Sequence, residues 1–368
     1  MVAICLPTPV RDDPELIDVR PEETLTLERL EPWLREHLPS TDGALSVRQF
    51  GGGHANLTYL VAFGDTEYVL RRPPLGPIAP TSHDMAREHR VLARLGEAFP
   101  LAPTSFALCR NESIIGVDFH VMERRQGHVI RTDLPASLIG DRANLRRLSE
   151  MVVDTIAALH AVDPGRVGLS DLGRPDGFVT RQLAGWSKRW HAAKDREIPA
   201  VDRLFSWLNE QIPCSDATTL LHNDYKLDNI LVDTHDPATA TAVLDWDMCT
   251  QGDPLMDLGY LLNVWVEPGD PPSWRETTAM PSHADGFMTR RDVVERYAER
   301  TGFDVGGARW YYAFGVFKLI VILQQIYIRY LRGQTQDPRF ADLGRRIEAF
   351  ADKGVVITRG GGNLRTAS

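Results

Sequence analysis

The residues best suited to chemistry lie at positions 222–229 (HNDYKLDN), directly before the apolar run at 230–232. Asp224 and Asn229 are five residues apart, which is the spacing of the H-R-D-x-x-x-x-N catalytic loop. In phosphoryl transfer to a hydroxyl group, a carboxylate accepts or orients the hydroxyl proton, while an amide oxygen and a second carboxylate hold Mg²⁺ on the nucleotide phosphates. The segment therefore indicates phosphoryl transfer.

A second acidic motif occupies positions 243–247 (VLDWD), at the end of the next predicted strand. A turn at 234–239 separates the two apolar runs, so we expect a hairpin that brings Asp245 close to the loop holding Asn229. Asp245 thus has the position of a metal-binding carboxylate. Asp247 is either a second metal contact or a solvated acid. P-loop, G-x-G-x-x-G, G-x-S-x-G and H-E-x-x-H motifs are absent, which disfavours the enzymes that carry them.

These two motifs, with Gly252-Asp253-Pro254 and Asp257 after them, resemble the aminoglycoside phosphotransferase-like kinases, a family related to the protein kinases. The resemblance extends from about residue 45 to nearly the end of the chain. It implies that Asp224 is the catalytic base, that Asn229 and Asp245 are Mg²⁺ ligands, and that His222 has an architectural role. It also implies that Asp257 is a buried helix residue bracing the loop. Lys226 either lies near the γ-phosphate or is an exposed loop lysine.

Weaker matches to the same family lie before residue 125. Gly51, Gly52 and Gly53 resemble the loop that covers the nucleotide, since glycines let backbone N–H groups approach phosphates. Residues 121–124 resemble the hinge whose backbone binds adenine, and the implied nucleotide-binding residues there are Met122, Glu123 and Arg124.

Arg71 departs from the family pattern, because it stands where the phosphate-binding lysine of the kinase fold is expected. Arginine is always charged and can hold phosphate oxygens with two N–H groups, but it is longer than lysine and planar. Glu88, on a helix predicted at 83–95, is the expected ion-pair partner of Arg71, although it could also be an ordinary surface residue.

The resemblance implies an ATP-dependent phosphotransferase that uses Mg²⁺ and ATP and modifies a hydroxyl of a small molecule. The segments 68–74 and 308–327 look most like the kinase portions fused to acyl-CoA dehydrogenases, so the acceptor is either aminoglycoside-like or a hydroxyacyl compound. The alternative is a nucleotide-binding pseudokinase or scaffold, supported by Arg71. A protein kinase is disfavoured, because no A-P-E activation segment follows Asp245.

The surrounding pattern predicts an α+β, protein-kinase-like fold with two lobes. Residues 1–24 are predicted to be a loose arm, 25–124 an N-lobe with an antiparallel sheet, and 125–368 a mainly helical C-lobe. Strand periodicity spans 45–72, whereas helical spacing dominates after Gly127. Pro32 is expected to break or kink a helix at 25–38.

Composition excludes several partners. With 41 basic and 50 acidic residues, the chain has a net charge of −9, which argues against wide contact with nucleic acid. The four cysteines are far apart and predict reduced thiols in a cytoplasmic protein. The apolar stretch 313–331 contains Lys318, Gln324 and Arg329, so it predicts a buried core helix and no membrane partner. The oligomeric state cannot be read from these patterns.

Overall fold

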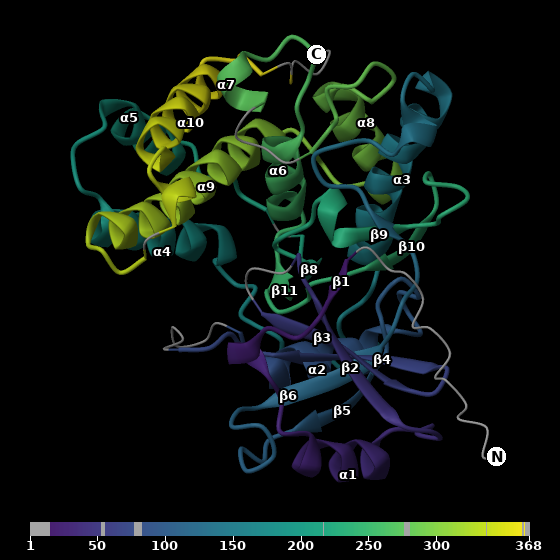
Figure 1. Cartoon of the computed structure of the whole chain (residues 1–368). Helices are drawn as coiled ribbons and strands as arrows, with labels where there is room; N and C mark the ends of the chain where they lie inside the picture. The colour runs from purple at the N-terminus through teal and green to yellow at the C-terminus, as the bar shows by residue number, and fades with distance from the viewer. Residues whose placement is uncertain are drawn as a thin grey trace, which may run out of the picture. The chain divides into compact units, whose positions relative to one another are not determined.

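A computed structural model describes residues 15–52, 56–76, 83–215, 217–275, 280–335, 337–362 and 364. The chain divides into two compact units. The first contains Met1–Gln126 and Leu244–Met248, and the second contains Gly127–Val243 and Cys249–Ser368. The predicted α+β fold, with an antiparallel sheet in the N-terminal part and helices in the C-terminal part, is confirmed (Figure 1). The short return of Leu244–Met248 to the first unit was not expected.

The first unit is built on a six-stranded antiparallel sheet with the strand order β1-β2-β3-β4-β6-β5. Its strands are β1 (Leu16–Ile17), β2 (Leu45–Phe50), β3 (Leu57–Phe63), β4 (Thr66–Arg72), β5 (Ser105–Cys109) and β6 (Phe119–Glu123). Its helices are the single turn η1 (Pro21–Glu23), α1 (Leu27–His37) and α2 (Met85–Leu95).

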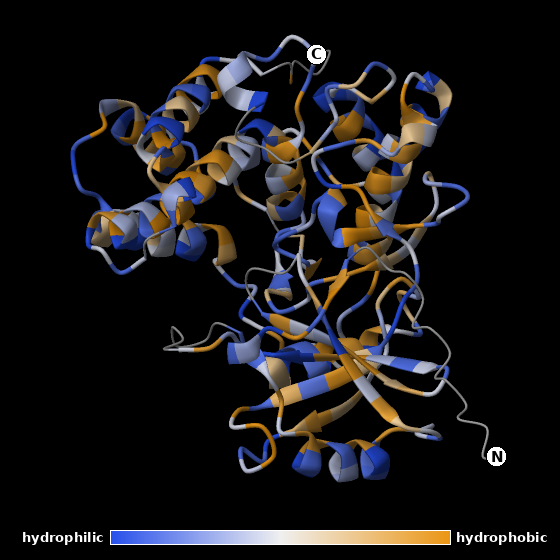
Figure 2. Ribbon diagram, viewed as in Figure 1, coloured by the Kyte–Doolittle hydropathy of each residue, from blue (hydrophilic) through white to orange (hydrophobic). Residues whose placement is uncertain are grey.

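Alternation along the strands gives the sheet two different faces. On one face, Tyr59, Val61 and Phe63 join a buried apolar cluster with Leu30 and Leu34 of α1. Successive strand residues point to opposite faces, so Arg71 and its cross-strand partner His120 lie on the other one, where α2 packs. In Figure 2 these strands accordingly carry both hydrophobic and hydrophilic residues. The pattern thus places Arg71 and His120 beneath α2.

The start of the chain differs from the prediction. Residues 1–14 lie outside the described part, but residues 15–24 are not a loose arm, because β1 pairs with β2. The Tyr59 hydroxyl donates to the Glu23 carbonyl at 2.7 Å, and the Arg20 N–H donates to Gln49 Oε1 at 3.0 Å. Pro21, the one proline among residues 15–24, is the first residue of η1, a position that needs no N–H donor.

Pro32 does not break α1, which runs from Leu27 to His37 without interruption. Proline removes one backbone hydrogen bond of the helix, and here tertiary contacts offset that loss. Leu30 and Leu34, on either side of Pro32, are fully buried against the sheet. The predicted break is therefore wrong, while the alternative of a kink at Pro32 stays a prediction.

The second unit contains eight described α-helices and two small sheets, ordered β10-β9-β7 and β11-β8. The helices are α3 (Arg142–His160), α4 (Phe178–Ala193), α5 (Pro199–Glu210), α6 (Leu255–Val264), α7 (Pro272–Arg275), α8 (Arg290–Thr301), α9 (Ala308–Leu331) and α10 (Leu343–Thr358). The strands are β7 (His128–Val129), β8 (Thr219–Leu221), β9 (Ile230–Val232), β10 (Ala240–Val243) and β11 (Thr250–Gly252). The single turns are η2 (Ala136–Leu138), η3 (Leu227–Asn229) and η4 (Pro338–Phe340).

Helix α9 is central to the second unit and packs against α4, α5, α6 and α10. Among the described residues it is the one helix whose length and apolar composition would suffice to cross a membrane, and most of it is buried inside the unit. It meets α6 backbone to backbone at two glycines. A Cβ atom on Gly259 would lie 2.3 Å from the Tyr311 carbonyl oxygen, and one on Gly315 would lie 2.7 Å from the Gly259 carbonyl oxygen. The crossing therefore tolerates only glycine at these positions.

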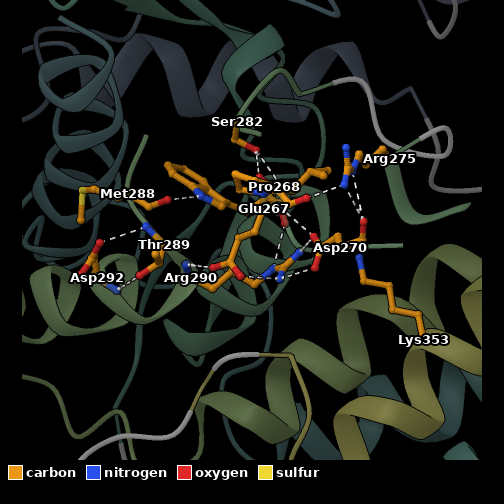
Figure 3. A network of polar contacts seen from close by, with 12 residues as sticks. Glu267, Pro268, Asp270, Arg275, Ser282, Met288, Thr289, Arg290, Asp292 and Lys353 are labelled. Carbon is orange, nitrogen blue, oxygen red and sulfur yellow. Dashed lines mark hydrogen bonds and ion pairs between the residues drawn. The ribbon is translucent and has the colours of Figure 1, made fainter. Parts of the chain in front are cut away.

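A buried ionic cluster joins the chain after α6 to the start of α8 (Figure 3). Arg290 is completely buried, and its guanidinium binds the Asp270 carboxylate through both terminal nitrogens. Its Nε donates to the Trp265 carbonyl oxygen at 2.9 Å, and its backbone N–H donates to Glu267 Oε1 at 2.6 Å. One side chain thus holds residues 265–270 in place.

Candidate functional site

The loop between β8 and β9 brings Asp224 and Asn229 together. The Asn229 side-chain amide donates to the Asp224 carbonyl oxygen at 2.8 Å and to Asp224 Oδ2 at 3.0 Å. The single turn η3 brings the two residues back toward each other, because the Asn229 N–H donates to the Lys226 carbonyl oxygen at 3.0 Å. The five-residue spacing therefore produces a carboxylate whose orientation is fixed by a neighbouring amide.

Asp257, in the first turn of α6, holds the start of this loop. Its completely buried carboxylate accepts the backbone N–H of His222 through Oδ2 and that of Asn223 through Oδ1, both at 2.7 Å. His160 of α3 lies 3.3 Å from Oδ2 and bonds to the Tyr297 hydroxyl at 2.6 Å. Burial alone would raise the pKa of Asp257, but His160 and the loop N–H groups lower it below its ordinary value. Asp257 thus braces the loop, as the resemblance implied.

Lys226 faces two carboxylates of the same loop. Its Nζ lies 3.3 Å from Asp224 Oδ2 and 3.5 Å from Asp228 Oδ2, and its side chain is about one quarter exposed. Burial raises the pKa of Asp228. Lys226 is therefore not a freely solvated loop lysine. Its predicted role near the γ-phosphate stays a prediction.

In the first unit, Arg71 is the centre of a second charged group. The side chain is 9% exposed. Its Nη2 donates to Asp245 Oδ1 at 2.7 Å, and its Nε lies 3.3 Å from Glu88 Oε2 without hydrogen-bond alignment. The expected ion pair between Arg71 and Glu88 is therefore present. Burial disfavours the charged guanidinium, but the two carboxylates outweigh burial and raise the pKa of Arg71.

Glu88 is the buried anchor of this group, with no exposed surface. In addition to Arg71, its carboxylate contacts His120 Nε2 at 3.2 Å and accepts the Trp246 backbone N–H at 3.4 Å. Burial by itself would raise the pKa of Glu88, but Arg71 and His120 lower it to about 2. Glu88 therefore links α2, the sheet and the returning segment 244–248 within one unit.

Glu88→Gln is expected to lower the free energy of unfolding by about 3 kcal/mol at neutral pH, since a pKa lowered from 4.5 to about 2 corresponds to roughly 1.4 kcal/mol per unit. A depressed carboxylate pKa stabilises the fold above pH 4.5, and this contribution is lost as the pH falls from 4.5 toward 2. Urea unfolding of wild type and variant from neutral pH into acid should show the difference shrinking. A pH-independent difference would contradict the ionic origin, and the exposed Glu28→Gln variant is the control.

The segment 244–248 also positions Asp247. Its Oδ2 accepts the side-chain amide of Asn56 at 3.3 Å. Burial first, then Asp245 and Glu88, raise the pKa of Asp247 to about 7. Asp247 is therefore partly buried and bonded to Asn56, and is not a fully solvated side chain. Whether Asp247 is a second metal contact stays a prediction.

Two residues next to the predicted chemistry have left-handed backbones, Asn223 at φ +68° and Asp245 at φ +66°. Such conformations are uncommon outside glycine, although Asn and Asp tolerate them best. Strained residues of this kind concentrate at functional sites, where the surrounding structure holds them. The backbone at Asn223 and Asp245 is therefore part of the candidate site, in addition to the side chains.

The other predicted nucleotide contacts lie in and around the sheet. Gly51 and Gly52 form a turn directly after β2, while Gly53 lies outside the described residues. Met122 is almost buried in β6 opposite Val69. The glycine loop therefore follows a sheet strand, as the sequence suggested.

The last two residues of the predicted hinge are held by sheet and ring contacts. The Glu123 N–H donates to the Thr104 carbonyl oxygen at 2.8 Å, and its carboxylate accepts the Thr104 N–H at 3.1 Å. The Arg124 guanidinium lies 4.9 Å from the centre of the Phe50 ring. These contacts fix the strand end, and adenine binding by this backbone stays a prediction.

The residues predicted to bind Mg²⁺ offer the hard oxygen ligands that this ion prefers. With its amide nitrogen turned to Asp224, Asn229 presents its amide oxygen, and Asp245 presents a carboxylate that is 28% exposed. No cluster of three or more His, Cys, Asp or Glu side chains suited to a metal occurs in the part of the chain that the structure describes. The donor chemistry thus fits an ion that also takes ligands from phosphates and water.

Several residues at these sites were not identified from the sequence. They are Asn56, His120, His160, Tyr297 and Lys318. Tyr297 bonds to His160, and each of the other four contacts a predicted residue or its neighbour in the chain from a distant part of the sequence. Of these residues, only Lys318 could have been singled out from the sequence, because it is a lysine inside a mostly apolar stretch. From the sequence alone, this lysine serves only as evidence that the stretch does not span a membrane.

Residues 46–291 match the phosphotransferase enzyme family. The chain is 32% identical over 354 residues to acyl-CoA dehydrogenase family member 11 of Rattus norvegicus, and the match covers 94% of this chain and 45% of that protein. The chain thus spans a little under half the length of this curated relative.

Solved structures share the fold. That of a candidate aminoglycoside phosphotransferase from Ralstonia eutropha has a TM-score of 0.78 and 32% identity, and the match covers 92% of this chain and 99% of that one. A thermostable mutant of the aminoglycoside phosphotransferase APH(4)-Ia, in a ternary complex with ADP and hygromycin B, has a TM-score of 0.56 and 17% identity. That match covers 89% of this chain and 99% of the other.

Proposed function

Because the chain belongs to the phosphotransferase enzyme family, we propose that it transfers the γ-phosphoryl group of ATP to a hydroxyl group of a small molecule. The observation that carries this proposal is the braced loop in which Asn229 orients the Asp224 carboxylate and Asp257 holds the preceding backbone. A loop that serves only as a connection does not need a buried carboxylate for two of its N–H groups.

In this proposal Asp224 accepts the proton of the acceptor hydroxyl, and the oxygen of that hydroxyl attacks the γ-phosphorus. The bond from the γ-phosphorus to the bridging oxygen breaks, and ADP leaves with the electron pair. Lys226 and Arg71 supply positive charge for the phosphates. Most of the rate gain comes from positioning and charge stabilisation, because the chain contributes no covalent step.

Asn229 and Asp245 are the residues that would hold Mg²⁺. When bound, this ion neutralises charge that develops on the phosphate oxygens. The support for this assignment is the pair of hard oxygen donors, together with the ADP bound to a structural relative.

Two acceptor classes are supported, each by a relative. The relative that binds hygromycin B suggests an aminoglycoside-like alcohol, and the acyl-CoA dehydrogenase family member suggests a hydroxyacyl compound. The experiment is to measure ADP release from Mg-ATP across aminoglycosides, amino alcohols, sugars and hydroxyacyl-CoAs, with mass spectrometry of each acceptor. Acceptor-dependent ADP release with one added phosphoryl group supports the proposal. ADP release without a modified acceptor in any class would contradict it.

One observation favours a second candidate function, a nucleotide-binding protein without transfer. Arg71 donates to Asp245 at 2.7 Å, so the predicted phosphate-binding and metal-binding side chains are bonded to each other. If this bond persists with nucleotide present, neither group is free for its role. Mg-ATP binding by calorimetry, with no phosphorylated acceptor across the panel, would support this candidate.

Asp245→Asn is expected to lower turnover by about 10²–10³-fold, because it removes a charge that stabilises the transition state. Asparagine keeps an oxygen that can accept from Arg71, so the fold should be retained. A Mg²⁺ titration of ADP release should show a raised metal requirement for the variant. Turnover equal to that of the exposed control Asp352→Asn would show that Asp245 holds no essential ion.

A further inference from the structure

Helix α9 carries a buried lysine next to the loop that holds Asp224. Lys318 is 8% exposed, and its Nζ donates to the Asn223 carbonyl oxygen at 2.8 Å. The ammonium lies 4.9 Å from the centre of the Tyr260 ring and 5.8 Å from that of Trp186. Lysine is seldom buried, because removing its charge from water is costly, so a buried lysine in an apolar helix requires a specific partner.

That partner is the residue directly before Asp224, and it is held from two sides. The Asn223 N–H donates to Asp257 Oδ1 of α6 at 2.7 Å, while its carbonyl oxygen accepts from Lys318 of α9. Asn223 has the left-handed φ of +68°, a conformation that costs about 1–3 kcal/mol unless neighbouring groups impose it. The two helices therefore impose the turn from which the Asp224 side chain projects.

The distance between the two helices is itself fixed. Their backbones touch at Gly259 and Gly315, where no Cβ atom fits. Asp257 lies two residues before Gly259, and Lys318 lies three residues after Gly315. The crossing thus sets the spacing between the carboxylate and the ammonium that hold Asn223.

We propose that Lys318 is a positioning residue for Asp224, acting through its hydrogen bond to the Asn223 carbonyl oxygen. This inference rests on the proposed function, in which Asp224 is the base. The charged groups that face Lys318 are Asp224, Asp257, Arg189 and Lys226, and burial lowers the pKa of Lys318. Both the ammonium and the neutral amine can donate the hydrogen bond, so the positioning role holds in either state.

The chain offers a matched control in Lys353 of α10. Lys353 is buried as well, with no exposed surface, and its Nζ donates to the Asn263 carbonyl oxygen at 2.8 Å. The rings near it belong to Trp274, Tyr312 and Phe350. Lys353→Met therefore removes the same buried group as Lys318→Met, but from a carbonyl outside the loop 222–229.

The first experiment is amide hydrogen exchange of the whole 368-residue chain, which does not depend on activity. Lys318→Met should raise exchange in the peptide covering 222–229 about tenfold, because a buried hydrogen bond to the loop is lost. Lys353→Met should leave exchange in this peptide unchanged. Equal exchange of the loop in Lys318→Met and wild type would overturn the inference.

The second experiment measures kinetics with an acceptor that the panel of the proposed function identifies. Lys318→Met should lower kcat about 10- to 100-fold with the KM for Mg-ATP unchanged, because a small misplacement of a catalytic group has effects of this size. Lys318→Arg, which keeps a donor, should recover part of the rate. In the Asp224→Asn background, Lys318→Met should lower kcat no further, since a positioning residue acts only through the group that it positions.

An equal loss of kcat in that background would also overturn the inference, because it would show a general structural effect. The proposed function is tested by a separate result. If Asp224→Asn keeps wild-type turnover, Asp224 is not the base, whereas the exchange result still shows whether Lys318 orders the loop.

Discussion

Asp224→Asn is expected to lower kcat by about 10²–10⁴-fold, the range attributed to a positioned general base, with the KM for Mg-ATP unchanged. Asparagine has nearly the same shape and still offers an oxygen to the Asn229 amide, which donates to Asp224 Oδ2 at 3.0 Å. It cannot take up the hydroxyl proton at neutral pH. The loss therefore reports proton acceptance and charge, with little contribution from loop geometry.

The measurement is steady-state ADP release with an acceptor that the panel identifies, together with calorimetry of Mg-ATP binding. Asp352→Asn, on the exposed side of α10, makes the same chemical change away from the loop and should keep wild-type kcat. Near-normal turnover of Asp224→Asn would rule out Asp224 as the base. A large increase in KM for Mg-ATP with kcat retained would instead assign Asp224 to nucleotide binding.

Arg290→Met is expected to lower the free energy of unfolding by about 3–5 kcal/mol, because removing one partner of a buried ion pair leaves an uncompensated charge. Asp270 and Glu267 are each less than 10% exposed, and Glu267 Oε2 lies 3.3 Å from Arg290 Nη1 (Figure 3). The Trp265 carbonyl oxygen also loses its donor. Urea unfolding followed by tryptophan fluorescence measures the loss.

The adjacent Arg291 provides the control, since its side chain is about half exposed and pairs with Glu295 one helical turn away. Exposed ion pairs of this kind contribute little, so Arg291→Met should hardly change the unfolding midpoint. Adding Asp270→Asn to Arg290→Met should recover part of the stability, because it removes the stranded carboxylate. Equal effects of the two arginine substitutions would show that the buried cluster contributes no more than a surface pair.

Local patterns in the sequence predicted most of the elements. The alternation at 45–72 predicted strands, and the structure has β2, β3 and β4 there. Helical spacing was predicted after Gly127, and Leu145, Leu148 and Val152 show it within α3. These patterns depend only on residues that are near one another in the sequence, so they can be recognised before the tertiary structure is known. The break at Pro32 and the loose arm at 15–24 were predicted wrongly, because tertiary contacts outweighed a local preference there.

The sequence by itself also determined the pairing of Asp224 with Asn229, since one short turn closes the four residues between them. The resemblance to the kinase family implied that Arg71 and Glu88 would form an ion pair, and they do. The chemistry of the loop was thus encoded within a dozen residues.

Only the tertiary structure decided how that chemistry is held. Asp257, His160 and Lys318 come from three helices, and Lys318 is 95 residues away from the carbonyl oxygen to which it donates. Asp245 lies in a five-residue segment that joins the other unit, where Arg71 bonds to it. No periodic pattern in the sequence identifies such partners. The distances between them and the loop are set by burial and by helix crossings, such as the one at Gly259 and Gly315. Both exist only once the chain has packed.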